Sequence, residues 1–228
     1  MGKIRRLAVI PARGGSKRIK RKNIVEFHGK PLLYWTVNAA LKSALFDDVI
    51  VSTEDEEIAA IARESGASVP FLRENHADDL APSSAVTLEV MQRLNAQGKV
   101  YDMVAQLLAT CPLRGVEDIK SAVTNFDLKN VPSQISCFRF GWMNPWWAVQ
   151  LSEYGEPEAM FPVALKSRSQ HLPPLFCPSG AIWIAKPSAL ESAQSFYCPG
   201  HIFYELPWKA SLDIDNEDDL QMARDLFI

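Results

Sequence analysis

The most constraining feature of this chain is a regular alternation between short apolar runs and longer segments with helical periodicity. The run 7–10 is apolar and ends at Pro11, which predicts a buried strand followed by a loop. Apolar residues then recur at helical spacing within 32–45, and 49–52 has the composition of a second strand. Strand, loop, helix and strand in this order form a βαβ unit, in which the two strands lie parallel.

This alternation continues along most of the chain. Helical periodicity returns at 55–66, 83–94, 119–126 and 217–227, and strand-like runs occur at 69–72, 103–108, 135–138, 181–185 and 202–206. A chain of 228 residues, of which 47% are hydrophobic, is expected to form one main core. We therefore predict an α/β fold with a doubly wound, mostly parallel sheet and a ligand bound beyond the carboxyl ends of its strands.

The periodicity and composition of the sequence change from about residue 139. The segment 139–174 has weak periodicity, three tryptophans and five prolines. These features indicate an inserted, protruding arm and not another βα unit. We predict an α/β domain formed by 1–138 and 175–228, with 139–174 as a dimerisation element between its two parts.

The charges of the chain are distributed unevenly. Nine Lys and Arg residues precede the first acid, Glu26, and the last of the nine is Lys22; the remainder holds 15 basic against 27 acidic residues. This asymmetry indicates an anionic partner for the N-terminal segment, whereas the acidic remainder argues against a protein that coats nucleic acid. A compact polyanion such as a nucleotide fits better.

Several classes of protein are disfavoured by what the sequence lacks. No window approaches the roughly 18 apolar residues of a membrane span, and no signal-peptide pattern is present, so we expect a cytoplasmic protein without a membrane partner. The cysteines form no CxxC pair, which predicts reduced thiols that pack as apolar residues: Cys111, Cys137, Cys177 and Cys198. The histidines have no ligand spacing, and no chemistry is assigned to them: His28, His76, His171 and His201.

A basic, glycine-containing loop follows the first predicted strand. Backbone N–H groups at Gly14-Gly15 can approach an anion, and Arg13, Lys17 and Lys22 can neutralise a triphosphate and stabilise its departing half. The loop is neither a GxxxxGK[ST] nor a GxGxxG motif. The alternative is a solvated basic turn, but the density of cations at a strand end favours a phosphate site.

A cluster of acids lies near the C-terminus. In an extended segment, Asp213 and Asp215 point to the same side, roughly 6 to 7 Å apart, while Ile214 points into the core. Both carboxylates can therefore reach one Mg²⁺ ion. The acids at 217–219 have a simpler interpretation, because with Asn216 as N-cap they occupy the first turn of a helix and complement its dipole.

Six segments of the chain carry a recognisable pattern in their order and spacing: IPARGGSKRIKRKN, LRENHADD with Ser83-Ser84, ATCPLR, RSQHLPP, PSGAIWI and SLDID. Together they resemble acylneuraminate cytidylyltransferases, which join CMP from CTP to nine-carbon 2-keto acids. The first segment looks less like the related synthetases for the eight-carbon Kdo sugar, because Lys22-Asn23-Ile24 stands where those have KPL. The resemblance covers essentially the whole chain.

The resemblance implies a nucleotide-diphospho-sugar transferase fold, a homodimer made through the arm, and Mg²⁺ held by Asp213 and Asp215. The implied catalytic residues are Arg13, Lys17, Lys22 and Asp215, the last also being the candidate if a side-chain base is used. The implied nucleotide-binding residues are Ala12, Arg13, Gly14, Gly15, Ser16, Lys17, Lys22, Asn23, Arg73, Ser83 and Ser84. The implied sugar-binding residues are Thr110, Arg168, Gln170, Trp183, Phe196 and Tyr197.

The chain departs from the family pattern in the segments that the resemblance assigns to sugar binding. Leu108 replaces a glutamine, Ser179 an asparagine, and Trp146 or Trp147 a lysine. The expected substrates are thus CTP and a different or more apolar nonulosonic acid, of the legionaminic or pseudaminic type as well as N-acylneuraminate. The alternatives are another sugar nucleotidyltransferase of this fold, such as a Kdo cytidylyltransferase, a non-catalytic sugar-nucleotide-binding protein, and nucleic-acid binding through the basic loop.

Overall fold

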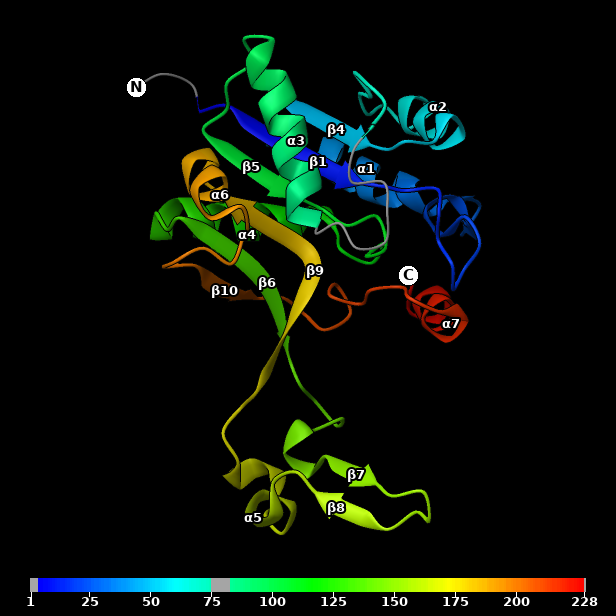
Figure 1. Cartoon of the computed structure of the whole chain (residues 1–228), viewed down its shortest axis with the longest axis vertical. Helices are drawn as coiled ribbons and strands as arrows, with labels where there is room; N and C mark the ends of the chain where they lie inside the picture. Colours follow the sequence, from blue (N-terminus) through cyan, green and yellow to red (C-terminus); the bar gives the residue numbers. More distant parts are fainter. Residues whose placement is uncertain (1–3, 75–82, 228) are drawn as a thin grey trace.

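A twisted sheet runs through the centre of the molecule (Figure 1). The structure is a computed structural model that describes residues 4–74 and 83–227. Within these ranges the strands of the main sheet follow the order β10-β6-β9-β5-β1-β4. Their bounds are Arg6–Pro11 for β1, Asp48–Ser52 for β4, Met103–Gln106 for β5, Ser133–Arg139 for β6, Phe176–Ala185 for β9 and Ile202–Glu205 for β10.

The sheet is mostly parallel, as the alternation of elements predicts. Strand β1 lies parallel to both of its neighbours, with Val9 opposite Ile50 of β4 and Gln106 of β5. Strand β10 is parallel to β6, whereas β9 runs antiparallel to β5 and β6. The carboxyl ends of β1, β4 and β5 therefore meet at one edge of the sheet, where α/β proteins bind ligands.

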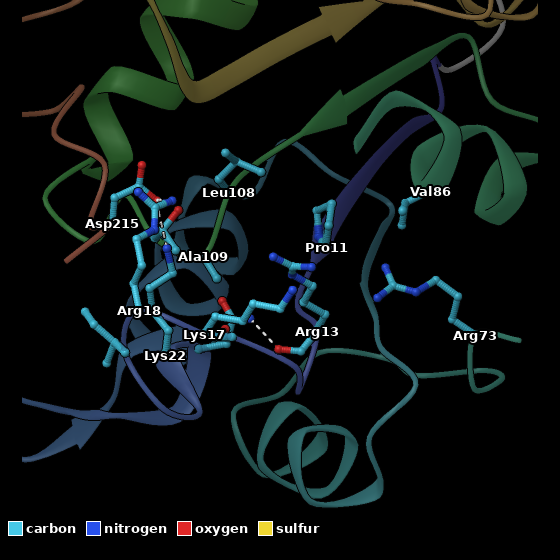
Figure 2. Close-up of a pocket in the computed structure, with 14 residues that line it drawn as sticks. Pro11, Arg13, Lys17, Arg18, Lys22, Arg73, Val86, Leu108, Ala109 and Asp215 are labelled. Carbon is cyan, nitrogen blue, oxygen red and sulfur yellow. Dashed lines mark hydrogen bonds and ion pairs between the residues drawn. The ribbon is translucent and has the colours of Figure 1, made fainter. Parts of the chain in front are cut away.

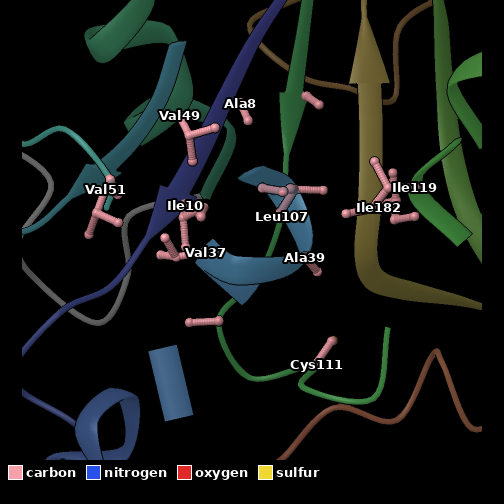
Figure 3. Packing of buried hydrophobic residues seen from close by; sticks show 14 of the residues in the cluster. Ala8, Ile10, Val37, Ala39, Val49, Val51, Leu107, Cys111, Ile119 and Ile182 are labelled. Atoms are coloured by element: carbon pink, nitrogen blue, oxygen red, sulfur yellow. The ribbon is translucent and has the colours of Figure 1, made fainter. Parts of the chain in front are cut away.

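Helices cover both faces of this sheet, because successive residues of β1 point to opposite sides. Ala8 and Ile10 pack with residues from α1, α2 and α4 (Figure 3), and Leu7 and Val9 pack with residues from α3 and α6. The bounds are Leu32–Ser43 for α1, Glu56–Glu64 for α2, Ser83–Ala96 for α3, Val116–Lys129 for α4 and Pro187–Ala193 for α6.

Two helices near the edge of the sheet begin at capping residues, of which Asn216 was expected. Asp55 caps α2, with its carboxylate accepting from the N–H groups of Glu57 and Ile58. Asn216 caps α7 (Glu217–Leu226) and forms a capping box with Asp219. The acids at 217–219 thus occupy the first turn of α7, where they satisfy backbone donors and complement the helix dipole.

A third, smaller cluster joins the N-terminal loop to the C-terminal segment. Ile19 of the basic loop and Ile214 are 3% and 0% exposed, and both belong to this cluster. It also contains residues of the β2 (Glu26–Phe27) and β3 (Lys30–Pro31) hairpin and of α7. Burial of Ile214 leaves its neighbours Asp213 and Asp215 outside the cluster, so this packing brings the basic loop and the acidic pair together.

The segment between β6 and β9 extends away from the sheet (Figure 1). It contains η2 (Pro145–Trp147), β7 (Val149–Leu151), β8 (Pro157–Ala159), α5 (Pro162–Leu165) and η3 (Ser169–His171). Large apolar side chains on it are exposed, including Trp142 at 85% and Val163 at 84%. This arm is therefore poorly covered by its own chain.

The structure corrects one expected strand. Residues 69–72 form no strand; the chain makes one bridge just before them, between Ile50 and Ser68. Pro70 lacks an N–H group, so pairing with β4 cannot continue past it. Cys111, Cys137 and Cys198 are buried, as expected of thiols that pack as apolar residues, whereas Cys177 is half-buried. Within the described ranges, no helix has both the length and the apolar character needed to cross a bilayer.

Candidate active site

A cavity of about 480 Å³ lies beyond the carboxyl ends of β1 and β5. In Figure 2, Asp215, Arg18 and Lys22 lie at one end of it, and Arg73 and Val86 lie at the other. The side chains of Arg13 and Lys17 lie between these two ends (Figure 2). The lining residues are Pro11, Arg13, Ser16, Lys17, Arg18, Ile19, Lys22, Asn23, Arg73, Val86, Leu108, Ala109, Thr110 and Asp215.

Hydrogen bonds to backbone groups of the basic loop after β1 hold this loop in place. Ala12 is buried, and its N–H donates to the carbonyl of Ser52 at 2.9 Å. The side-chain amide of Asn23 donates to the carbonyl of Arg13 at 2.8 Å, which joins the two ends of the loop. Gly15 is exposed, whereas the N–H of Gly14 donates to the carboxylate of Glu54 at 2.7 Å. The cationic side chains thus project from a fixed turn.

One carboxylate at the acidic end is paired with two cations of the loop. Oδ1 of Asp215 accepts from Nζ of Lys22 at 3.0 Å and from Nη2 of Arg18 at 2.9 Å. The Lys22 ammonium also donates to the carbonyl of Ile214 at 2.6 Å. The predicted phosphate-binding and metal-binding residues therefore lie in direct contact.

Asp213 lies beside this pair in a more enclosed position. Its Oδ1 atom is buried and has no hydrogen-bond partner in the described part of the chain. Burial raises the pKa of its carboxyl group above the ordinary range, and a hydrogen bond from Thr110 opposes part of this rise. An unpaired buried carboxylate oxygen is costly, and a bound cation would satisfy it.

Arg73 forms the far end of the cavity. Its side chain is 3% exposed, and Nη2 donates to Oε2 of Glu54 at 2.6 Å. The predicted Ser83 and Ser84 begin α3 but do not line the cavity; Ser84 is buried, and Oγ of Ser83 accepts from Gln106. Val86, from the same turn, does line it. His76 and most of the segment around it lie outside the described residues.

The wall between these two ends is formed by the loop after β5. Thr110 and Leu108 line the cavity, as does Ala109 between them. Leu108 packs directly on Gly180 of β9, where an added Cβ would overlap its side chain. The fully buried Arg114 donates to the carbonyls of Leu108 and Ala181 and so joins this loop to β9; burial lowers the pKa of its guanidinium to about 10.

The predicted sugar-binding aromatic residues form a cluster beside β9. The Trp183 ring meets those of Phe196 and Tyr197 edge-on, at 5.5 and 5.8 Å between centroids. Its indole N–H donates to the carbonyl of Ser179 at 2.6 Å. Phe196 is fully buried, whereas Tyr197 is 46% exposed. None of the three lines the cavity, so their contact with a sugar stays a prediction.

Arg168 and Gln170 are the predicted site residues on the arm. Both are exposed, Arg168 precedes η3 and Gln170 lies in it. Neither lines the cavity of its own chain.

Sequence reasoning missed several residues of this site. Glu54 contacts both Gly14 and Arg73, and Arg18 contacts Asp215. Glu54 follows β4 by two positions, at the edge of the sheet where ligands bind, and this placement was the available signal.

Comparison with known proteins identifies relatives along the whole chain. The chain is 36% identical to the pseudaminic acid cytidylyltransferase of Campylobacter jejuni, over 98% of this chain and 97% of that protein. It is 31% identical to the CMP-N,N'-diacetyllegionaminic acid synthase of Legionella pneumophila, over 98% of this chain and 96% of that protein. The names of both relatives agree with the cytidylyltransferase family that the sequence motifs resemble.

The fold and a family model agree with this comparison. A solved structure of CMP:2-keto-3-deoxy-manno-octonic acid synthetase complexed with CTP aligns with a TM-score of 0.72 at 18% identity, over 97% of this chain and 98% of that one. At this identity, the alignment shows that the two chains share a fold. The family model described as Cytidylyltransferase matches residues 7–140, which is more than half of the chain. The chain therefore belongs to the cytidylyltransferase family.

Proposed function

We propose that this protein transfers CMP from CTP to the anomeric hydroxyl of a nonulosonic acid and releases pyrophosphate. The observation that carries the proposal is the cavity in which the cations of the basic loop contact the carboxylate of Asp215, with Lys22 at 3.0 Å. Nucleotidyl transfer needs cations at the leaving pyrophosphate and oxygen ligands for a metal ion. Membership in the cytidylyltransferase family supports the same reaction.

In this proposal, different parts of the cavity bind the two halves of CTP. Arg13, Lys17 and Lys22 bind the triphosphate and stabilise charge on the departing pyrophosphate. Arg73 binds the nucleoside half at the other end of the cavity. Holding both halves of CTP orients the α-phosphate for in-line attack by the sugar hydroxyl.

Asp213 and Asp215 are the residues that would hold Mg²⁺. The buried, unpartnered Oδ1 of Asp213 fits a cation, and carboxylate oxygens are the ligands that Mg²⁺ prefers. No group of three or more metal-binding side chains occurs in the described ranges, which suits an ion that takes its other ligands from water and substrate phosphates. Bound there, Mg²⁺ would neutralise phosphate charge and lower the pKa of the attacking hydroxyl.

We propose a nonulosonic acid of the pseudaminic type as the preferred acceptor. The identity to the pseudaminic acid cytidylyltransferase is 36%, against 31% to the legionaminic acid enzyme. The cavity wall at Leu108 is apolar and is packed against Gly180, so it suits a deoxygenated or methyl-bearing part of a sugar better than a hydroxyl group.

We further propose that the arm makes a homodimer in which Arg168 and Gln170 reach the partner's site. The exposed apolar side chains of the arm support an interface, since large apolar patches on a surface are usually covered. Mixing Arg168→Ala with Asp215→Ala subunits tests this directly. Shared sites would restore activity to about one quarter of wild type, because half of randomly mixed dimers regain one intact site. No recovery in a mixture shown to exchange subunits would refute it.

A nucleotide panel tests the reaction. Purified protein with Mg²⁺ and a set of nonulosonic acids should release pyrophosphate from CTP at least about 100-fold faster than from ATP, GTP or UTP. Turnover of Kdo in preference to any nonulosonic acid would identify the related eight-carbon chemistry instead. CTP binding without turnover of any acceptor would indicate a non-catalytic nucleotide-binding protein, and tight, salt-sensitive retention of RNA would favour a nucleic-acid-binding protein.

A further inference from the structure

We propose that Glu54 is a positioning residue that holds the phosphate loop and Arg73 in a fixed relation across the nucleotide cavity. Its Oε1 accepts from the N–H of Gly14 at 2.7 Å, and its Oε2 accepts from Nη2 of Arg73 at 2.6 Å. One carboxylate thus links two walls of the cavity. Glu54 does not line the cavity itself, so it would act through the residues that it holds.

Arg73 depends on this carboxylate for its position. Its side chain is 3% exposed, and its Nε atom is buried with no hydrogen-bond partner in the described part of the chain. Among the described residues, Glu54 is the acid that pairs with this guanidinium and compensates its buried charge. The backbone N–H of Arg73 donates to the carbonyl of Thr53, so main chain and side chain of Arg73 are both anchored beside Glu54.

The loop depends on the same short segment. A Cβ on Gly14 would lie 2.6 Å from Oδ2 of Asp55, so the loop packs closely against the residue after Glu54. Asp55 in turn accepts two hydrogen bonds from Arg21, at 3.0 and 2.9 Å. Glu54 and Asp55 therefore fasten the loop at Gly14 and at Arg21, on either side of Lys17 and Arg18, two of the cationic residues that line the cavity.

This arrangement makes a specific prediction for nucleotide binding. An arginine clamp lowers the cost of ordering a ligand when its guanidinium is already oriented. Without the charge of Glu54, Arg73 would adopt other positions, and the nucleoside half of CTP would bind more weakly. The in-line geometry at the α-phosphate depends on the other end of the cavity, so turnover of bound CTP would change little.

Glu54→Gln tests the proposal, because glutamine keeps the shape and an acceptor for Gly14 but removes the charge opposite Arg73. We expect the Kd for CTP, measured by calorimetry without metal, and the KM for CTP to rise about tenfold or more, with kcat within about threefold of wild type. The matched control is Glu56→Gln, since Glu56 is exposed in the first turn of α2 and should leave CTP binding within about twofold.

Three further measurements separate positioning from a structural role. Circular dichroism checks that each variant is folded. Glu54→Asp is one methylene shorter and cannot reach both donors, so it should raise the Kd for CTP, but by a smaller factor than Glu54→Gln because it keeps the charge opposite Arg73. In an Arg73→Ala background, Glu54→Gln should add less than about twofold to the Kd for CTP. A folded Glu54→Gln variant with wild-type affinity, or a full tenfold effect that persists without Arg73, would overturn the proposal.

This inference rests on the proposed CTP site, and the two can fail separately. A wild-type protein that binds no CTP would refute the proposed function. The role of Glu54 is judged by the ratio of variant to wild-type affinity, so it fails only when wild type binds CTP and the variants bind equally well.

Discussion

Nζ of Lys22 lies 3.0 Å from Oδ1 of Asp215, although the two residues are 193 positions apart in the chain. The contact exists because Ile19 and Ile214 are buried in the same small cluster, which carries the basic loop and the acidic segment to one place. Cation and carboxylate neutralise one another while no ligand is bound. A triphosphate and a divalent ion would each take one member of this pair.

Lys22→Met should abolish most turnover. The substitution keeps the length of the side chain but removes the positive charge that, in our proposal, stabilises the departing pyrophosphate. The kcat/KM for CTP should therefore fall by about 100-fold or more. Pyrophosphate release measures this. Lys20→Met is the matched control, because Lys20 is an exposed lysine of the same loop that does not line the cavity, and it should stay within about threefold of wild type. Equal losses in both variants would contradict a specific role for Lys22.

Asp213→Asn and Asp215→Asn should separate metal binding from folding. Both variants should lose Mg²⁺-dependent turnover, and the additional rise in melting temperature that Mg²⁺ produces with CTP in wild type should disappear. Without metal, Asp213→Asn should be at least as stable as wild type, because burial disfavours the charge that this variant removes. Unchanged Mg²⁺ dependence of either variant would show that the metal ligands lie elsewhere.

Asp55 should contribute stability that depends on pH. The hydrogen bond from Arg21 is the largest cause that holds the pKa of Asp55 below its ordinary value of about 4. The folded protein therefore favours the charged carboxylate, so the stabilisation is complete above the ordinary pKa and is lost as the pH falls through the folded value. Asp55→Asn keeps a good helix cap but loses this charge. Its melting temperature should lie below that of wild type at pH 7, and the difference should narrow as the pH falls below the ordinary pKa of an aspartate. A difference that is constant with pH would contradict this account.

Gly180→Ala should be destabilising through its contact with Leu108. The new Cβ would overlap the Leu108 side chain, and overpacking of this kind costs about 1–3 kcal/mol. Adding Leu108→Ala should recover part of that loss, because it removes the overlapping atoms, and chemical denaturation of the four proteins measures the coupling. Independent, additive effects would mean that the two residues do not share this contact.

Local patterns of the sequence predicted much of this fold. The apolar periodicities identify the strands β1, β4, β5 and β6 and the helices between them, because each pattern depends on residues a few positions apart. The cap at Asn216 and the inward direction of Ile214 follow from similarly local signals. The strand predicted at 69–72 was wrong because Pro70 ends its pairing.

Other features could not be predicted because they depend on the path of the whole chain. The reversed direction of β9 follows from the arm that precedes it, and no periodicity within 176–185 shows a strand's direction. Glu54 joins Gly14 to Arg73 only because two loops end at the same edge of the sheet. The contact between Leu108 and Gly180 likewise links positions far apart in the chain.

Mass spectrometry can identify the product that the purified protein forms from CTP, Mg²⁺ and pseudaminic acid, with legionaminic acid, N-acetylneuraminic acid and Kdo in parallel. We expect a CMP-sugar together with an equal amount of pyrophosphate, formed fastest with the pseudaminic acid, and no product from Asp215→Ala. Absence of a CMP-sugar with every nonulosonic acid, from protein that binds CTP, would contradict the proposed function.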